Sequence, residues 1–423
     1  MNRIEKLLQK LCPDGVEFKA LGEVCDALPK GTLKQQQLQN EGYPVINSGR
    51  ELYGYYSQFN NEGNAIVITS HGAYAGFTHY LQGKFWAGGL CYPYRSKNEN
   101  ELLTKFIFYY CKDKNKIIKS FVAEGSIPYI NKSLLDKLKI PLPPLEIQKE
   151  IVLILDAFTE LQAELQAELQ ARQKQYEHYR ERLLSFDELE RRAHLCASLR
   201  ASVANAAIQS KNIDCHEFAT ANSRNDEPTP LVKMMSLGEV AFYPKDRILA
   251  DFLHAQNYVG VENLLPNKQG KTNSSSVPKS GNSIHYKQGD CLIGNIRPYL
   301  KKIWLADNDG GTNGDVLLIR TKNEFVDKIQ NKFLYYVLAS DSFFAYHDSN
   351  ARGAKMPRGD KSAVLKFQIP IPPLKVQNEV MEILDKFDAL VNDISQGLPA
   401  EMALRKKQYE HYREKLLSFK EKA

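Results

Sequence analysis

The run Ile140-Pro141-Leu142-Pro143-Pro144-Leu145 organises this chain, because it returns as Ile369-Pro370-Ile371-Pro372-Pro373-Leu374. Paired prolines fix φ and remove backbone donors, so each run predicts a helix that begins directly after it. Apolar residues then recur at steps of four and three, the heptad pattern of helices that pack side by side. They are Ile147, Ile151, Ile154, Phe158, Leu161 and Leu165 in the first copy, and Val376, Val380, Ile383, Phe387, Leu390 and Ile394 in the second.

Each predicted helix ends in nearly the same block of sequence, KQYEHYRERLLSF at residues 174–186 and KQYEHYREKLLSF at residues 407–419. Between its proline run and its block, the second copy has gained about one helical turn. The gain lies near Ser395, where Gly397 and Pro399 should end one helix and start another. The first copy instead repeats Glu-Leu-Gln-Ala through residues 160–171, all strong helix formers. We therefore expect a continuous first helix and a second helix that is broken near residues 397–399.

The composition is that of a globular protein. The 423 residues are 43% hydrophobic and 25% charged, which suits two or three domains. We find no apolar run near the roughly 18 residues needed to cross a bilayer and no signal-peptide core, so we expect a cytoplasmic protein without membrane contact. The seven cysteines are scattered without a CxxC pair, which predicts free thiols and no zinc site. The net charge of +6 favours an anionic partner only weakly.

The sequence before each proline run is also repeated. The tetrapeptide Leu-Gly-Glu-Val occurs at residues 21–24 and again at 237–240, and each copy opens a stretch that has diverged around a shared skeleton. The skeleton contains a turn before an apolar strand, a basic strand end and an aromatic helix. Its matching segments are 62–68 with 288–294, 95–97 with 320–322, and 106–110 with 333–337. The chain is therefore predicted to be one unit written twice.

These repeats predict an α+β fold with two globular domains at opposite ends of two long antiparallel coiled-coil helices, related by a pseudo-twofold axis. A polar linker would return the chain to the start of the second domain. The expected boundaries are 1–144 for the first globular domain, 145–210 for the first long helix, 211–235 for the linker, 236–373 for the second globular domain and 374–423 for the second long helix.

A search for catalytic motifs finds none: the chain has no GxxxxGK[ST] loop, no HExxH and no GxSxG. The two Pro-Pro pairs lack the neighbouring Asn and aromatic residue that would hold a flipped base, so we interpret them as structural turns. His178 and His411 have no second ligand four residues on, which favours exposed helix residues over metal ligands or acid–base groups. We expect no catalytic residue, no metal and no cofactor.

The terminal block is conserved between the two copies on its polar face as well as its apolar face. Packing requires only the apolar face, so one hypothesis is that both copies dock the same partner and that two partner copies bind one chain. The alternative is recent duplication, against which stands the divergence of the globular stretches. The candidate partner-binding residues are Tyr176, Glu177, His178, Arg180 and Glu181, with Tyr409, Glu410, His411, Arg413 and Glu414.

The globular stretches differ in the loops that follow strands or precede the long helices. Arg pairs bidentately with guanine and Asn with adenine, while Lys suits phosphates. These residue types make the loops candidate readers of DNA, although each such residue is equally consistent with a solvated loop position. The candidates are Ser70, His71, Tyr74, Lys112, Lys114, Lys116, Lys119, Tyr129, Asn131 and Lys132 in the first stretch, and Asn295, Arg297, Tyr299, Lys301, Lys302, Asn350, Arg352, Lys355 and Arg358 in the second.

The domain order, the paired proline runs followed by Gln148 and Gln377, the Leu-Gly-Glu-Val repeats and the QYEHYRE blocks resemble the specificity subunit of type I restriction-modification systems over essentially the full length. The resemblance implies two target-recognition domains, each reading one half of a split site on double-stranded DNA. It implies two helices that hold them apart and bind two methyltransferase subunits. Adenine methylation would belong to those partners and cleavage to restriction subunits. The broken second helix and the long linker depart from a fully symmetric pattern.

Two other interpretations stay open at this point. The recognition subunit of a fused restriction-methylation enzyme uses the same architecture with a different partner. A coiled-coil scaffold whose globular domains bind proteins belongs to another class, and it would show no salt-dependent binding to a defined duplex.

Overall fold

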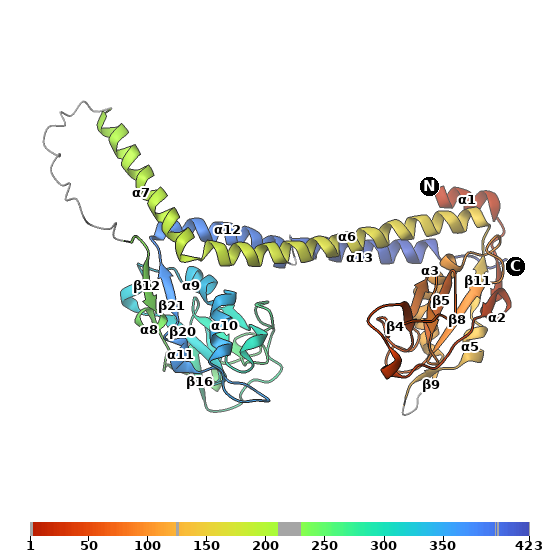
Figure 1. Ribbon diagram of the computed structural model, residues 1–423, viewed down its shortest axis with the longest axis horizontal. Helices are drawn as coiled ribbons and strands as arrows, with labels where there is room; N and C mark the ends of the chain where they lie inside the picture. The colour runs from red at the N-terminus through yellow and green to blue at the C-terminus, as the bar shows by residue number, and fades with distance from the viewer. Residues whose placement is uncertain (1–2, 124–126, 210–229, 394, 396, 423) are drawn as a thin grey trace. The chain divides into compact units, whose positions relative to one another are not determined.

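The computed structural model describes residues 3–123, 127–209, 230–393, 395 and 397–422. The chain forms two compact units: unit 1 comprises Met1–Ala167 with Glu401–Ala423, and unit 2 comprises Glu168–Ala400. Each mixes sheets with helices, and the long helix α6 (Leu145–Leu183) continues from unit 1 into unit 2 (Figure 1). The predicted α+β class, with two globular parts and a long helix between them along the chain, is confirmed.

Unit 1 is built on a four-stranded antiparallel sheet in the order β2 (Cys25–Ala27), β8 (Cys91–Ser96), β5 (Ala65–Thr69) and β6 (Thr78–Leu81). A second sheet has the order β4 (Gly54–Tyr56), β3 (Tyr43–Ile46) and β7 (Trp86–Ala87), and two short pairs join β1 (Glu17–Ala20) to β11 (Lys139–Leu142) and β9 (Val122–Ala123) to β10 (Tyr129–Ile130). The helical elements are α1 (Arg3–Leu11), α2 (Leu21–Val24), η1 (Gln35–Gln37), α3 (Thr104–Asp113), α4 (Asn115–Ser120), α5 (Lys132–Asp136), the first part of α6 and most of α13 (Leu398–Leu416).

Unit 2 repeats the central sheet in the same order, with β13 (Ala241–Phe242), β20 (Val316–Thr321), β17 (Cys291–Gly294) and β18 (Ile303–Leu305). The other sheets are β14 (Arg247–Leu249), β16 (Asn282–Tyr286), β19 (Gly310–Thr312) and β15 (Tyr258–Val259), and the pair β12 (Lys233–Ser236) with β21 (Gln368–Ile371). The helical elements are α7 (Phe186–Gln209), α8 (Leu237–Val240), η2 (Ala250–Phe252), η3 (Pro298–Leu300), η4 (Asn323–Phe325), α9 (Asn331–Leu338), α10 (Asp341–Ser349), α11 (Lys361–Val364), α12 (Leu374–Asn392) and the second part of α6. The repeat predicted from sequence is thus a repeat of strand order.

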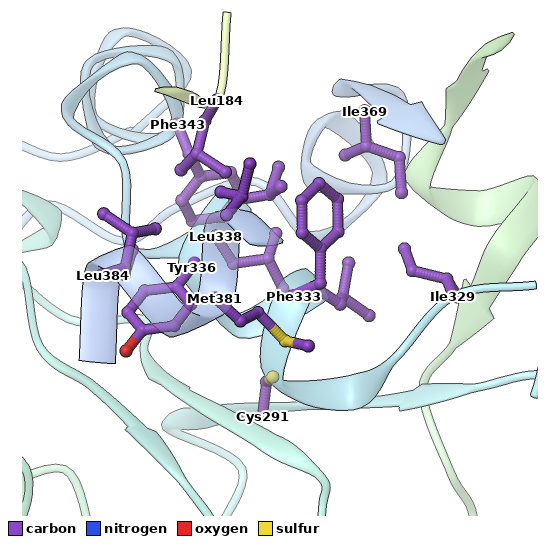
Figure 2. Packing of buried hydrophobic residues seen from close by; sticks show 14 of the residues in the cluster. Leu184, Cys291, Ile329, Phe333, Tyr336, Leu338, Phe343, Ile369, Met381 and Leu384 are labelled. Atoms are coloured by element: carbon purple, nitrogen blue, oxygen red, sulfur yellow. The ribbon is translucent and has the colours of Figure 1, made fainter. Parts of the chain in front are cut away.

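The core of unit 2 joins the central sheet to the long helices. Cys291 on β17, Phe333 on α9 and Leu384 on α12 converge on one buried cluster, which Figure 2 shows together with Ile369 on β21. Burying a side chain of this size contributes roughly 1.5–3 kcal/mol to folding. Helix α12 is therefore anchored to the domain by its apolar face.

The glutamine after each proline run explains why that signature is repeated. Gln148 is fully buried, accepts a hydrogen bond from the Leu103 N–H (2.8 Å), and donates to the carbonyl oxygens of Glu101 (2.8 Å) and Pro143 (2.7 Å). In unit 2 the side chain of Gln377 makes the same three bonds, with the corresponding partners Gln330, Lys328 and Pro372. Each glutamine satisfies backbone groups at the entry to α3 or α9, so it locks the long helix to its domain.

The break in the second long helix is confirmed. Helix α12 ends at Asn392 and α13 begins at Leu398. A Cβ on Gly397 would lie 2.4 Å from the Ala389 carbonyl oxygen, so this tight turn requires glycine. Pro399 then lies in the first turn of α13, where a missing donor costs nothing.

The first long helix is continuous through its Glu-Leu-Gln-Ala repeats, as predicted, but a single helix over residues 145–210 is wrong. Helix α6 ends at Leu183 and α7 begins at Phe186. The Ser185 hydroxyl accepts from the Glu188 N–H (3.4 Å), and Ser-x-x-Glu is the sequence of a helix-capping box. A new helix start therefore competes with continuation at Ser185.

The start of β12 is tied to α7. The Glu190 carboxylate accepts from the N–H groups of Leu231 (2.9 Å) and Val232 (2.7 Å). Most of the predicted linker, residues 211–229, lies outside the described residues, and the last part of it belongs to β12. These two bonds hold the residues just before β12 against α7.

Within each unit the long helices pack antiparallel. In unit 1, Phe158 of α6 packs its ring against Tyr409 and Tyr412 of α13. In unit 2, Tyr176 and Tyr179 of α6 stack on Phe387 of α12. The heptad pattern predicted these contacts, because Phe158 and Phe387 are equivalent apolar positions in it.

Candidate nucleic-acid interface

In unit 1 the loop after β5 lies against the segment that leads into α5. The Gly72 N–H donates to the Pro128 carbonyl oxygen (2.9 Å), and the Ile130 N–H donates to the Ser70 carbonyl oxygen (2.8 Å). These bonds place His71 beside Tyr129, with ring centroids 6.0 Å apart and nearly parallel planes. Two candidate readers that lie far apart in sequence thus form one surface.

In unit 2 the same backbone bonds join the corresponding loops. The Arg297 N–H donates to the Pro357 carbonyl oxygen (2.8 Å), and the Gly359 N–H donates to the Asn295 carbonyl oxygen (3.0 Å). By this match, Arg297 is the equivalent of Gly72 in unit 1, and Arg358 is the equivalent of Tyr129. One backbone frame therefore carries different side chains in the two units.

Arg297 adopts a left-handed conformation at the position where unit 1 has glycine. Its φ is 53°, and that of Gly72 is 86°. Side chains with a Cβ disfavour this region, and residues held there cluster at functional sites. The arginine is held in its strained conformation by the frame around it.

Other predicted residues of unit 1 divide between surface and structural roles. Tyr74 is exposed, and the Arg50 guanidinium lies 5.0 Å from the centre of its ring. Asn131 caps α5 by accepting from the Ser133 N–H, and Lys132 pairs with Asp136 four residues on (2.7 Å). Asn131 and Lys132 therefore have local explanations, and Arg50, which the sequence patterns did not single out, lies beside the candidate Tyr74.

The predicted lysine cluster does not act as one basic track. Lys112 turns toward α13 and packs over the ring of Tyr409, where burial and the neighbouring Arg413 lower its pKa. Lys114 pairs with Asp113 (3.0 Å). Only Lys116 and Lys119 are exposed, at the edge of an open cleft of about 1270 Å³. The cleft also has acidic walls, so it is not uniformly basic.

In unit 2 the exposed candidates gather on two adjoining loops. Arg297, Tyr299, Arg352, Lys355 and Arg358 are all exposed, and the side chain of Arg352 is 87% exposed. Arg358 is held by Asp315 (2.8 Å), which orients its guanidinium while leaving much of it accessible. These five side chains are the strongest candidates for contact with nucleic acid.

The remaining candidates of unit 2 serve the protein itself. Asn295 is buried, Asn350 closes the end of α10 by donating to the Tyr346 carbonyl oxygen (2.8 Å), and Lys302 donates to the Val261 carbonyl oxygen (2.7 Å). Lys301 is paired with Asp341 (2.8 Å). The partners of Lys301 and Lys302 could not be predicted from the sequence, because Asp341 and Val261 lie in distant segments.

The terminal block faces its own domain more than was predicted. Tyr176, Arg180 and Tyr409 are buried, and Arg413 pairs with Asp113 at the end of α3 (3.2 Å). Glu181 accepts from the Asp341 N–H at the start of α10 (2.5 Å). These five side chains therefore have contacts within the chain, and their contact with a separate partner stays a prediction.

A smaller set of block residues does face outward. Glu177 and His178 of α6 are exposed, and so are Glu410, His411 and Glu414 of α13. A cavity adjoins the block in each unit, of about 350 Å³ in unit 2 and 540 Å³ in unit 1. Equivalent block positions line both: Gln173, Tyr176, Glu177 and Arg180 in unit 2, and Lys406, Tyr409, Glu410 and Arg413 in unit 1.

A duplicated unit with divergent loops and a shared helical block defines a protein with two recognition domains. The family model for the type I restriction modification DNA specificity domain matches residues 13–172 and 232–403. The chain belongs to this family.

Relatives match over nearly the whole chain. A putative type I restriction enzyme specificity subunit from Haemophilus influenzae is 28% identical, covering 98% of both chains. The type I restriction enzyme EcoR124I/EcoR124II specificity subunit from Escherichia coli is 28% identical, covering 99% of this chain and 97% of its own. The solved S subunit of a type I restriction-modification system from M. genitalium shares the fold, with a TM-score of 0.53, 17% identity and coverage of 95% of this chain and 96% of its own. Within the described residues no helix is long and apolar enough to span a membrane.

Proposed function

We propose that this chain is the DNA sequence-recognition subunit of a type I restriction-modification complex. Each globular domain would read one half of a bipartite, asymmetric site on double-stranded DNA. The observation that carries this proposal is the common backbone frame at Gly72 and Arg297, because it presents Tyr129 in one unit and Arg358 in the other. A fixed frame with exchanged side chains is what two different half-sites require.

The long helices would set the spacing between the half-sites and dock two methyltransferase subunits. Support comes from the exposed pairs Glu177–His178 and Glu410–His411, which are identical although the domains beside them have diverged. Adenine methylation and DNA cleavage would then belong to partner subunits, in the cytoplasm. The relatives are named specificity subunits of type I systems, so a fused-enzyme subunit or a protein-binding scaffold is not favoured.

The DNA proposal is tested by mapping methylated adenines in cells that express this chain with its methyltransferase partner. We expect one bipartite motif with a fixed gap. Tyr129→Ala should relax only one half-site and Arg358→Ala only the other, each by about 1–3 kcal/mol of discrimination. The control Lys132→Ala, which removes an exposed ion pair in unit 1, should leave both halves intact. A motif without two halves would refute the proposal.

The partner proposal is tested by native mass spectrometry of the assembled complex. The charge reversals Glu177→Lys and Glu410→Lys should each reduce the number of bound methyltransferase subunits from two to one. Glu168→Lys, another exposed acidic position on α6, is the control. Full occupancy in both variants would show that the partner docks elsewhere.

A further inference from the structure

Left-handed backbone is concentrated in one place in unit 2. Among the described residues, the non-glycine positions with positive φ are Asn267, Lys268, Arg297 and Lys301. They lie in two loops that bind each other: the Asn267 N–H donates to the Leu300 carbonyl oxygen (2.8 Å), and the Lys268 N–H donates to the Lys301 carbonyl oxygen (2.9 Å). Such strain persists only where the surroundings over-determine it, so something must hold this loop pair.

The holding group is Asp341, the first residue of α10. Its carboxylate lies 2.7 Å from the Lys268 ammonium and 2.8 Å from the Lys301 ammonium, one from each loop. Burial by itself would raise the pKa of this carboxyl group, but the two lysines lower it to about 2. Asp341 is therefore charged at any physiological pH and joins both loops at their strained positions.

Asp341 is itself fixed from the other side. Its N–H donates to the Glu181 carboxylate of the terminal block (2.5 Å), and the Ser340 hydroxyl caps α10 by accepting from the Phe343 N–H (3.1 Å). The loop pair thus rests on a residue anchored to the helix start and to α6. Movement of the loops would break charged contacts at both lysines.

We call the pairing of Asp341 with Lys268 and Lys301 the clamp. Unit 1 forms the equivalent loop without it. Tyr109 and Tyr336 are equivalent, because each donates to the carboxylate of an aspartate on its long helix, Asp156 or Asp385. Five residues further along, unit 1 has Lys114 where unit 2 has Asp341. Its loop instead uses Gly72, which takes positive φ without strain. The clamp therefore occurs in the unit whose loop has Arg297 in place of the glycine.

We propose that Asp341 is a positioning residue for half-site recognition by unit 2. It holds the loop pair so that Arg297 and Tyr299 face the bases, and it keeps Lys268 and Lys301 from binding backbone phosphates without regard to sequence. The inference rests on the proposed DNA-recognition function and adds the residue that sets specificity in one domain. Removing the carboxylate charge frees two ammonium groups, so the order of the loops and the sequence dependence of binding change together.

The test compares Asp341→Asn with Asp341→Glu and the native chain, each assembled with its methyltransferase partner. Binding is measured to the cognate duplex, to a duplex altered only in the half-site read by unit 2, and over a range of salt. We expect Asp341→Asn to lose discrimination against the altered half-site by about tenfold and to bind with a steeper salt dependence. Asp341→Glu should restore part of both, and discrimination at the other half-site should stay unchanged.

A matched control is Asp246→Asn, which breaks an ion pair to Arg320 elsewhere in unit 2 (2.7 Å) and should change neither readout. Lys301→Met removes one arm of the clamp without freeing a charge. It should weaken discrimination without steepening the salt dependence, and it decides the case if Asp341→Asn fails to fold. Unchanged discrimination in Asp341→Asn or in Lys301→Met overturns the inference. A native complex without sequence preference overturns the proposed function instead.

Discussion

Gln148 and Gln377 occupy equivalent positions in the two units, and the buried side chain of each binds three backbone groups at buried or partly buried positions. Leaving a buried donor or acceptor unsatisfied costs about 1–3 kcal/mol. We therefore expect Gln148→Leu to destabilise unit 1 and Gln377→Leu to destabilise unit 2 by about 2–4 kcal/mol each. Denaturant unfolding checks this, with fluorescence from Trp86 reporting on unit 1 and from Trp304 on unit 2. The neighbouring exposed substitution Lys149→Ala should stay within about 0.5 kcal/mol, and an equally small effect of Gln148→Leu would show that the bonds are dispensable.

Arg180 and Arg413 are identical in sequence context but differ in their partners. Arg413 pairs with the buried carboxylate of Asp113, whereas Arg180 is 3% exposed and two of its guanidinium nitrogens have no hydrogen-bond partner. Unit 2 has Ser340 at the position that corresponds to Asp113. A buried charge with unsatisfied donors is destabilising, and replacing it by an apolar side chain is often neutral or favourable.

Arg180→Met is therefore expected to keep or raise the stability of unit 2, and Arg413→Met to lower that of unit 1 by about 1–3 kcal/mol. Calorimetry of the two variants checks the difference in sign. Equal losses in both would mean that the aliphatic stems, and not the charges, matter at these positions.

The sequence predicted the elements whose signals are local. The proline runs located the starts of α6 and α12, and Gly397 with Pro399 located the break before α13. The capping box at Ser185 and the cap at Asn131 were local signals too, but the continuing apolar pattern and the polar composition concealed them. Roles that depend on distant segments could not be read from the chain. The burial of Arg180 and the pairing of Lys301 with Asp341 arise only when the repeat folds.

His347 gives unit 2 a stability that depends on pH. The ring is fully buried on Phe343, and neither ring nitrogen meets hydrogen-bond geometry, so burial lowers its pKa to about 4 although the nearby Gly294 carbonyl opposes the shift. The unfolded chain, with the ordinary pKa of 6.5, takes up the proton first as the pH falls. Stability is full above about pH 6.5 and is lost toward pH 4, by about 3 kcal/mol at most.

Substituting His347→Leu should remove this contribution to the slope of unfolding free energy against pH between 6.5 and 4. Urea titrations at several pH values measure the slope of the unit 2 transition. His79→Leu is the contrast, because His79 also has a pKa lowered by burial but lies in unit 1. A native slope in His347→Leu would assign the acid sensitivity of unit 2 to its carboxylates.

The Glu-Leu-Gln-Ala repeats of α6 supply the last prediction, which concerns spacing. Most side chains of residues 160–171 are exposed, and the division between the two units falls within this segment. Inserting one further repeat adds about 6 Å of helix, which corresponds to somewhat under two base-pair steps of duplex. We expect the gap between the two half-sites to lengthen while the bases read in each half stay the same, because the insertion touches neither set of loops. Methylome sequencing of cells that carry the insertion measures both the gap and the bases read in each half.

A scrambled insertion of the same length and helix propensity, such as Leu-Glu-Ala-Gln, controls for local sequence and should shift the gap equally if helix length is what matters. An unchanged gap with intact methylation would rule out α6 as the spacer, and an altered half-site would show that the helix transmits strain into the reading loops.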